Sequence, residues 1–259
     1  MKHIESRANP LYKQLYKWQS SAGRRGEPAL LDGLHLCEAW LASGRRPLHA
    51  LFDVDRIEHP AHVGLIRRLN AEQCVTMSGS LLRTLSSFDS DQGVIFVAQQ
   101  PVFELPERLK EPVVLFDRIQ DPGNVGTLLR TCAAAGIRRV LASPGTAALW
   151  SPKVLRSAQG AHFGLQMHEQ VNLMDVLDRL DVALVATALD DAQDLFATHL
   201  PAKCAWVFGH EGQGVDAALL KRATLRVRIE HDPSVESLNV TAAAAICLFE
   251  QRRQLSTAA

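Results

Sequence analysis

Charged and amide side chains follow an apolar segment in the stretch Asp117-Arg-Ile-Gln-Asp-Pro-Gly-Asn124. The pattern predicts a strand before this stretch, over Val113–Phe116, and a helix after it, over Val125–Ala135. Ligands of open α/β sheets bind beyond the carboxyl ends of strands, so this loop is a candidate ligand site. Taken alone, Asn124 is expected to cap the helix, and Arg130 is expected to be solvated because it lies off the apolar stripe.

A second candidate is the glycine-rich loop Phe208-Gly-His-Glu-Gly-Gln-Gly214, which follows another predicted strand. Glycines permit unusual backbone dihedrals and close approach of a ligand. The loop is not a Walker A sequence, because no Lys-Ser/Thr pair follows it. It is not a nucleophile elbow either, because Glu211 stands where serine would be needed. The alternative is a tight turn with a solvent-exposed Glu211, but the density of glycine favours a ligand loop.

Two further patterns do not indicate a functional site on their own. Ser237-Leu238-Asn239 precedes the last predicted helix, where Ser and Asn are ordinary caps. His59 and His62 are three residues apart, but Pro60 interrupts the helix that would align them, and no third ligand is evident. We therefore predict no metal site.

The elements that must position these loops alternate between strands and helices along residues 113–259. Apolar strands in alternation with helices indicate an α/β fold with a parallel sheet covered on both faces. The predicted strands are Val113–Phe116, Val140–Ala142, Val182–Thr187, Ala205–Phe208 and Leu225–Ile229. The predicted helices are Val125–Ala135, Pro152–Gln159, Leu173–Leu180, Val215–Arg222 and Asn239–Gln254. The last helix is apolar on every side over Ala242–Phe249, which is typical of a helix buried in a core or an oligomer interface.

A smaller α/β domain is predicted at residues 1–100, with a proline-rich linker at 101–112 before the domain at 113–259. Residues 1–46 hold eight Lys/Arg against four acids, which is either a phosphate-binding face or a solvated helix face. On charge alone the solvated face is favoured. The predicted elements are a basic amphipathic helix, a second helix and three strands: Asn9–Gln19, His35–Ala42, Ala29–Leu31, Leu48–Phe52 and Val94–Ala98.

The composition is that of a globular protein and excludes several classes. The chain has 259 residues, with 47% apolar and 22% charged residues and no net charge, which excludes overall disorder. Its apolar runs are too short to span a membrane, and no secretory signal follows the first residues. Five scattered cysteines without a CxxC pair are typical of reduced thiols, so we expect a cytoplasmic protein.

The order and spacing of three segments are more specific than any one of them. Asp117–Arg130, Phe208–Gly214 and Ser237–Asn239 with its alanine-rich helix resemble the three motifs of the SpoU (TrmH) family of RNA 2′-O-ribose methyltransferases, within the SPOUT superfamily. The N-terminal segments Ile4–Trp18 and Leu30–Gly44 resemble, more loosely, the L30e-like substrate-binding domain often fused to these enzymes. The likeness to the methyltransferase domain runs from about residue 113 to 254.

This resemblance implies a fold, a cofactor, partners and a set of site residues. The parallel sheet would contain a deep trefoil knot that binds S-adenosyl-L-methionine (AdoMet), and the enzyme would be a homodimer through the knot region and the C-terminal helix. The RNA substrate would be ribosomal RNA, with tRNA second. The catalytic residues carried over from the motifs are Asn124, Arg130, Glu211, Ser237 and Asn239. The cofactor-binding residues are Thr187, Ala188, Gly209, Ile229 and Leu238.

Methyl transfer to a ribose requires that the 2′-hydroxyl lose or share its proton. The motif-one arginine, Arg130, is regarded in the family as catalytic, but a guanidinium stays protonated. Our hypothesis is that Arg130 clamps a phosphate beside the target ribose, and that this phosphate or a water relays the proton. One departure stands out: the family usually has Ile-Pro-Met-x-Gly after the last strand, whereas this chain has Ile229-Glu-His-Asp-Pro233. The change brings acidic groups and His231 near the expected cofactor pocket.

Two other classes of function remain open from the sequence. One is a non-catalytic RNA-binding ribosome-assembly factor with the same fold, which the altered segment after Ile229 keeps in view. The other is a methyltransferase for small molecules or proteins, against which the L30e-like domain and its basic first helix argue. The complete set of motif residues favours the RNA methyltransferase.

Overall fold

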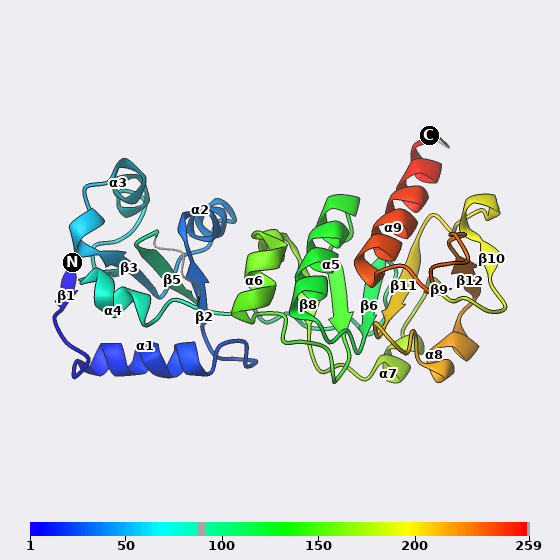
Figure 1. Cartoon of the computed structure of the whole chain (residues 1–259), viewed down its shortest axis with the longest axis horizontal. Helices are drawn as coiled ribbons and strands as arrows, with labels where there is room; N and C mark the ends of the chain where they lie inside the picture. Colours follow the sequence, from blue (N-terminus) through cyan, green and yellow to red (C-terminus); the bar gives the residue numbers. More distant parts are fainter. Residues whose placement is uncertain (88–91, 258–259) are drawn as a thin grey trace. The chain divides into compact units, whose positions relative to one another are not determined.

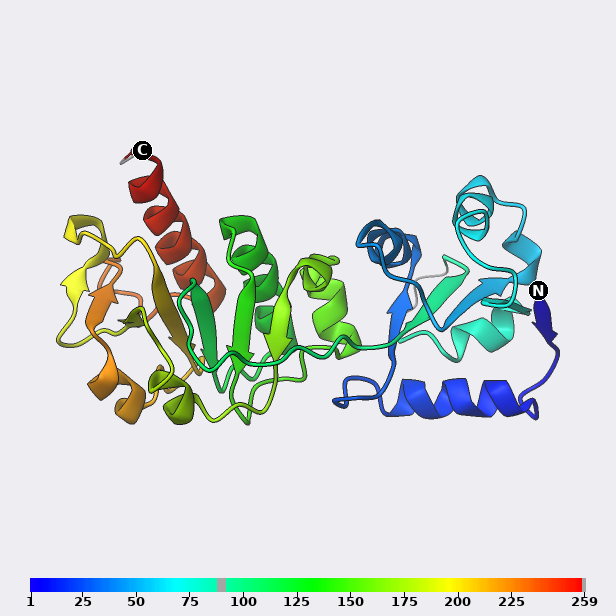
Figure 2. The same ribbon diagram turned by 180° about the vertical axis from the view of Figure 1, so that it is seen from behind.

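A computed structural model describes residues 1–87 and 92–257 of the chain. The chain forms two compact units (Figures 1 and 2), residues 1–102 with 150–163 and residues 103–149 with 164–259. In this division Trp150–Phe163 groups with the first unit, and most of the segment expected as a linker, residues 103–112, groups with the second. The Phe163 ring meets Trp40 edge-on at 5.1 Å, and the Phe163 carbonyl accepts a hydrogen bond from Arg45 Nη1 at 2.8 Å.

The first unit is built on a mixed five-stranded sheet in the order β1-β4-β3-β5-β2. Strands β1, β4 and β3 run parallel, while β5 runs antiparallel to both β3 and β2. The strands are β1 (Lys2–Ile4), β2 (Ala29–Asp32), β3 (His49–Asp53), β4 (Cys74–Met77) and β5 (Val94–Ala98). The helices are α1 (Pro10–Ser20), α2 (Leu34–Ala42), α3 (Pro60–Ile66), α4 (Gly79–Arg83) and α6 (Pro152–Ala158), with short 3-10 turns η1 (Val54–Arg56) and η2 (Ala161–Gly164).

Helix α1 forms where its amphipathic pattern predicts it. The Asn9 side chain caps it by accepting the N–H of Leu11 at 2.9 Å, and Pro10 occupies the first turn, where no N–H is needed. Tyr12 and Leu15 are buried against the sheet, in a cluster with Leu51 and Val75. The opposite face of α1 is exposed and carries its lysines.

The second unit contains an all-parallel seven-stranded sheet in the order β10-β12-β9-β11-β6-β7-β8. The predicted α/β fold class, with a parallel C-terminal sheet after a small α/β domain, is confirmed. The strands are β6 (Val113–Asp117), β7 (Arg139–Ala142), β8 (Gln166–His168), β9 (Ala183–Thr187), β10 (Gln193–Asp194), β11 (Cys204–Gly209) and β12 (Leu225–Arg228). The helical segments are α5 (Pro122–Ala135), α7 (Leu173–Leu177), η3 (Leu195–Ala197), α8 (Ala217–Arg222) and α9 (Val240–Thr257).

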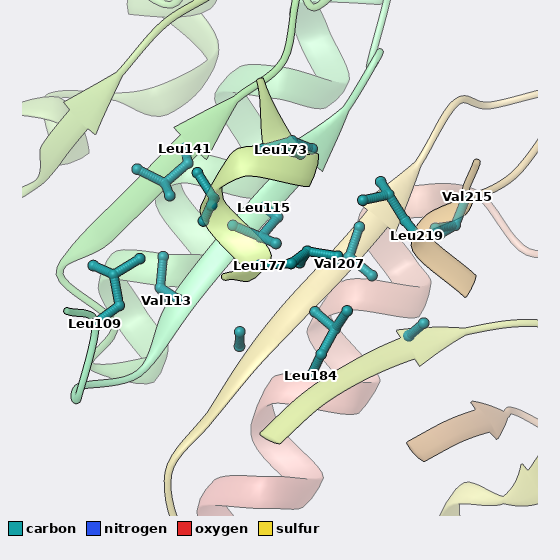
Figure 3. Packing of buried hydrophobic residues seen from close by; sticks show 13 residues of the cluster. Leu109, Val113, Leu115, Leu141, Leu173, Leu177, Leu184, Val207, Val215 and Leu219 are labelled. Carbon is teal, nitrogen blue, oxygen red and sulfur yellow. The ribbon is translucent and has the colours of Figure 1, made fainter. Parts of the chain in front are cut away.

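Side-chain alternation along the central strands sends apolar residues to both faces of this sheet. On one face, Leu115 of β6 and Val207 of β11 pack with Leu177 of α7 and Leu219 of α8 (Figure 3). On the other face, α5 and α9 lie side by side (Figure 1), and the buried Trp206 of β11 donates its Nε1–H to Gln251 of α9 at 2.8 Å. A sheet covered on both faces offers ligands its carboxyl edge rather than a face.

Helix α9 is only partly covered within the single chain. Ala244, Cys247 and Leu248 are buried, but Phe249 is 45% exposed and Ala242 is exposed as well. The sequence predicted that this apolar helix is buried in a core or in an oligomer interface. The core of the single chain buries one side of the helix and leaves the other side exposed. Among the described residues, no helix combines the length and the apolar character needed to cross a membrane.

Candidate active site

Three loops meet at the carboxyl edge of the parallel sheet. Strands β6 and β11 are neighbours in register, with Asp117 opposite Gly209 at their last residues. The loop after β6 and the glycine-rich loop after β11 therefore leave the sheet side by side. The loop after β12 leads into α9 and supplies the third motif.

The first loop ends in a cap that sequence reasoning assigned to the wrong residue. Asp121, rather than Asn124, caps α5, because its Oδ1 accepts the N–H of Asn124 at 2.8 Å. The reason lies in Pro122: proline is favoured at the first helical position, which puts the cap one residue before it. Asn124 is then inside the first turn, and its side-chain amide is free to bond elsewhere.

Glu211 fastens the glycine-rich loop onto the first loop. Its carboxylate accepts the backbone N–H groups of Gln120 and Asp121, both at 3.1 Å, and the Nδ2–H of Asn124 at 3.0 Å. Burial by itself would raise the pKa of Glu211. The hydrogen bonds, that from Asn124 first among them, outweigh burial, and the pKa lies below its ordinary value. Glu211 is thus a carboxylate held in place and not the exposed turn residue of the alternative interpretation.

Asn239 joins the third motif to the same cluster. Its Nδ2 donates to the Oδ1 of Asn124 at 3.3 Å, while its own Oδ1 accepts the N–H of Thr241 at 2.8 Å and so caps α9. Asn124, Glu211 and Asn239, which lie far apart in the sequence, thus form one hydrogen-bonded chain. All three were predicted as catalytic residues.

The other two predicted catalytic residues are not bonded to this chain. Arg130 is exposed further along α5, as its position off the apolar stripe indicated, and no hydrogen bond or ion pair to it occurs within the described residues. Ser237 is exposed and lines the neighbouring cavity. Both side chains are available to a ligand.

A cavity of about 420 Å³ opens beside the cluster, between the loops after β9, β11 and β12. This volume lies in the range of about 300–1,000 Å³ that is usual for small-molecule sites. Residues of apolar and of charged type both contribute to its wall, Leu189 and Val240 among the former. All five residues predicted to bind the cofactor line it: Thr187, Ala188, Gly209, Ile229 and Leu238.

Two glycines shape this cavity. A Cβ at the buried Gly209 would collide with the backbone of Gly214 and Val215, so the loop can fold back only over glycine. Gly214 has a φ of +68°, in the left-handed region, with open space where its side chain would be. The loop therefore presents bare backbone to the cavity.

His210 lines the cavity and is held by its own loop. Its Nδ1 accepts the N–H of Gly212 at 2.9 Å and that of Gln213 at 3.2 Å. In the neutral ring the proton is therefore on Nε2, which makes that atom a donor rather than a base. Glu211 makes a separate set of bonds to the first loop, so the adjacent pair is not an acid–base dyad.

An ion pair between Arg118 and Asp117, which was not predicted from the sequence, connects the first loop to the glycine-rich loop. Arg118 has a left-handed φ of 58° and donates to both oxygens of the buried Asp117, at 2.9 and 3.0 Å. Its Nη1 also donates to Gln213 Oε1 at 3.0 Å, and Asp117 Oδ2 accepts the N–H of Asp216 at 2.8 Å. Its hydrogen bonds to the Asp117 carboxylate raise the pKa of the Arg118 guanidinium. An acid directly after an apolar strand is the sequence signal, but its partners depend on the tertiary fold.

The cavity wall includes charged residues of both signs. Arg226 donates its Nε–H to the carbonyl of Leu220 at 3.1 Å, and its Nη1 lies 4.0 Å from Asp191. Asp190 and Glu236 line the same cavity. A zwitterionic group would find both signs of charge there.

The altered segment after Ile229 contributes to this cavity mainly through two residues. Of its residues, only Ile229 and His231 are in the wall, and His231 Nδ1 lies 2.8 Å from the Ile229 carbonyl. Glu230 turns to Arg228, 3.6 Å away, and the exposed Asp232 accepts the N–H of Ser234 at 2.9 Å. Glu230 is thus near the cavity, as expected, through its pairing with the wall residue Arg228, but neither Glu230 nor Asp232 is itself part of the wall.

A parallel α/β sheet whose carboxyl edge holds a small-molecule cavity beside a polar cluster defines a ligand-binding enzyme of the open-sheet class. A model of the SpoU rRNA Methylase family matches residues 111–249. The chain belongs to this family, as the three motifs predicted.

Relatives that match over nearly the whole chain belong to the same class of enzyme. The chain is 34% identical to RlmP, the 23S rRNA (guanosine(2553)-2′-O)-methyltransferase of Bacillus subtilis, over 97% of this chain and 100% of that protein. It is also 34% identical to an uncharacterized tRNA/rRNA methyltransferase of Synechocystis, over 97% of this chain and 93% of that protein. The crystal structure of the SpoU methyltransferase AviRb of Streptomyces viridochromogenes, in complex with AdoMet, superposes with a TM-score of 0.84 at 25% identity. That match covers 96% of this chain and 99% of AviRb.

Proposed function

We propose that this protein transfers a methyl group from AdoMet to a ribose 2′-hydroxyl of ribosomal RNA. The observation that carries the proposal is the hydrogen-bonded chain of Asn124, Glu211 and Asn239 beside a cavity of cofactor size. The names of the full-length relatives support ribosomal RNA as the substrate and AdoMet as the cofactor. The bacterial rRNA methyltransferases among the relatives support the proposal of a cytoplasmic location.

The cavity fits AdoMet in both shape and charge. Bare backbone at Gly209 and Gly214 allows close approach of a ligand, and Ile229 and Leu238 offer apolar surface for an adenine. The amino-acid tail of AdoMet carries a carboxylate and an ammonium group. Arg226 is suited to the carboxylate, and Asp190 or Glu236 to the ammonium. When bound, the cofactor supplies a methyl group on a sulfonium.

The chain's own residues position the RNA and manage the proton. Arg130 is exposed and bonded to no group among the described residues, so its guanidinium is available to clamp a phosphate beside the target ribose. It remains protonated, so the proton of the 2′-hydroxyl passes to that phosphate or to a water. Glu211 is held by hydrogen bonds that lower its pKa, and one of them comes from Asn124. Glu211 is therefore suited to be a positioning residue that orients Asn124. Ser237, at the cavity wall, is suited to contact the ribose.

The uncovered side of α9 is proposed as part of a homodimer interface. Ala242 and Phe249 are seven residues apart, two turns of helix, and both are exposed in the single chain. A second copy would cover them. Phe249→Glu should convert the dimer to a monomer in size-exclusion chromatography with light scattering, whereas Gln14→Glu, which adds the same charge at an exposed position of α1, should leave the dimer intact. A monomeric wild-type chain would contradict the dimer.

The function is tested by labelling RNA with methyl-tritiated AdoMet. The substrates are ribosomal RNA and tRNA from a strain that lacks the gene. The expected product is label in alkali-resistant dinucleotides of ribosomal RNA, because a 2′-O-methyl group blocks alkaline cleavage of the adjacent phosphodiester. Arg130→Ala should abolish it, while Arg138→Ala, an exposed arginine beyond the end of α5, should not.

Other outcomes would select another function. Label confined to tRNA would replace the substrate, and alkali-labile label would exclude ribose methylation. Absence of label in both RNAs, with RNA binding intact, would indicate the non-catalytic assembly factor.

A further inference from the structure

A recess of about 430 Å³ lies on the first unit, between α1 and the end of α4. Its lining comes from the loop before α1, from α1 itself and from the residue that follows α4: Arg7, Tyr12, Lys13, Tyr16 and Thr84. Neither the methyltransferase motifs nor the cofactor cavity involve these residues.

The floor of the recess is fixed by Tyr12. This side chain is 3% exposed, and its hydroxyl bonds to the Leu81 carbonyl at 3.2 Å and to the Thr84 hydroxyl. One turn further along α1, Tyr16 lies beside Tyr12 on the helix surface. Unlike Tyr12, Tyr16 is 53% exposed, so its ring forms an open wall.

The charged residues that line the recess are both positive. Arg7 and Lys13 line it, and no carboxylate does. Both cations are exposed, and neither forms a hydrogen bond or an ion pair within the described residues. A solvated helix face would explain one free lysine, and a lone exposed aromatic needs no explanation. A concave site with two free cations and an open aromatic ring is a more particular combination.

We propose that this recess binds an unpaired nucleotide of the RNA substrate. Its base stacks on Tyr16, and its flanking phosphates contact Arg7 and Lys13. Proteins bind single-stranded nucleic acid with aromatic rings and cations, because every base can stack on a ring and every phosphate carries a negative charge. An acidic peptide would use the cations but not the exposed ring. The proposal rests on the proposed function, and it adds a second contact point for the RNA.

The test uses the full-length protein and unmodified ribosomal RNA transcribed in vitro. Dissociation constants are measured by filter binding, and methylation kinetics are measured in parallel. Tyr16→Leu should weaken RNA binding by about 5- to 150-fold, the loss expected for one stacked base. Tyr16→Phe keeps the ring and should stay close to wild type. Both changes are at an exposed position, and thermal unfolding checks that the fold is kept.

The cation contacts are tested by salt dependence. Lys13→Ala should reduce the slope of log K against log salt by about one, the value expected for one lost phosphate contact. Lys17→Ala is the matched control, because Lys17 is an exposed lysine of α1 outside the recess. The loss should appear in KM for RNA, while kcat at saturating RNA and the affinity for AdoMet stay unchanged.

The outcomes separate this site from the function on which it rests. If the wild type methylates RNA but Tyr16→Leu binds like wild type, the recess is not a nucleotide site and the function stands. Equal effects of Lys13→Ala and Lys17→Ala would also overturn the site, in favour of diffuse surface charge. If the wild type neither binds nor methylates RNA, the proposed function fails and the site fails with it. Binding of an acidic peptide with loss in Tyr16→Leu, and none of RNA, would overturn the nucleotide assignment.

Discussion

The Nδ2 of Asn124 donates a hydrogen bond to the Oε1 of Glu211 at 3.0 Å, across 87 positions of sequence. This bond joins the helix that follows β6 to the loop that follows β11. Because Glu211 also accepts two backbone N–H groups of the first loop, the two loops form one body at the edge of the sheet. Glu211 is also part of the wall of the cavity that lies beside these loops.

The first prediction concerns the energy of that bond. Asn124→Ala and Glu211→Ala should be coupled in a double-mutant cycle, with an interaction of about 0.5–3 kcal/mol in the free energy of unfolding in urea. The reason is that each side chain loses its partner when the other is removed. Thr127→Ala, an exposed change on the same helix, should be additive with Glu211→Ala. Additivity of the Asn124 pair would mean that the bond does not hold the loops together.

The second prediction concerns pH. The pKa of Glu211 is lowered in the folded protein, so its contribution to stability is complete above the ordinary value of 4.5 and is lost as the pH falls through the folded-state pKa. The stability difference between wild type and Glu211→Gln should therefore be largest near neutral pH and shrink in acid. Urea unfolding at about pH 7 and about pH 3 measures it. Thr127→Ala, an exposed change on α5 without an ionisable group, should give a difference that does not vary with pH, and a constant difference for Glu211→Gln would contradict the role of its hydrogen bonds.

A third prediction follows from the space around Gly209. Alanine there would collide with the backbone of Gly214 and Val215, so the loop must move away from the cavity. Gly209→Ala should reduce stability by about 3 kcal/mol or more and abolish AdoMet binding in calorimetry. Gly64→Ala is the control, since a Cβ in the middle of α3 meets nothing within 4 Å and alanine is the better helix former. A Gly209→Ala protein that binds AdoMet normally would show that this cavity is not the cofactor site.

The fourth prediction assigns Arg226 to the cofactor's carboxylate. Arg226→Leu should weaken binding of S-adenosylhomocysteine by about tenfold or more, because a charge-assisted hydrogen bond is lost. It should leave binding of 5′-methylthioadenosine unchanged, because that ligand lacks the amino-acid tail. Arg222→Leu removes an exposed arginine that pairs with Asp178 outside the cavity, and it should affect neither ligand. Equal losses for both ligands would place Arg226 in a structural role.

Much of the fold followed from periodicity. The five predicted strands of residues 113–259 and the helices between them are present, with ends shifted by a few residues. Strands such as β4 and β10, and short helices such as α3, were not predicted, because segments this short carry little periodicity and form through their neighbours. Pro60 was interpreted as interrupting a helix, whereas it opens α3 with His59 as its cap.

The candidate site was predictable in its residues and not in their partners. The motifs predicted Asn124, Glu211 and Asn239 as site residues. The hydrogen bond from Asn124 to Glu211 was missed, because the sequence indicates local hydrogen bonds such as helix caps and not those between distant loops. The bonds from the Arg118–Asp117 ion pair to Gln213 and Asp216 were missed for the same reason. The knot that the resemblance implies, like the roles of the individual site residues, stays a prediction.

The proposed role of Arg130, which is to clamp a phosphate beside the target ribose, is measured by single-turnover methyl transfer to ribosomal RNA with bound AdoMet. Arg130→Ala and Arg130→Lys should both lower the transfer rate by about a hundredfold or more while AdoMet affinity stays at the wild-type value. Lysine keeps the charge but not the two-pronged geometry of the guanidinium. An Arg130→Lys enzyme that transfers methyl at the wild-type rate would contradict the phosphate clamp, and an Arg130→Ala enzyme that does so would remove Arg130 from the mechanism.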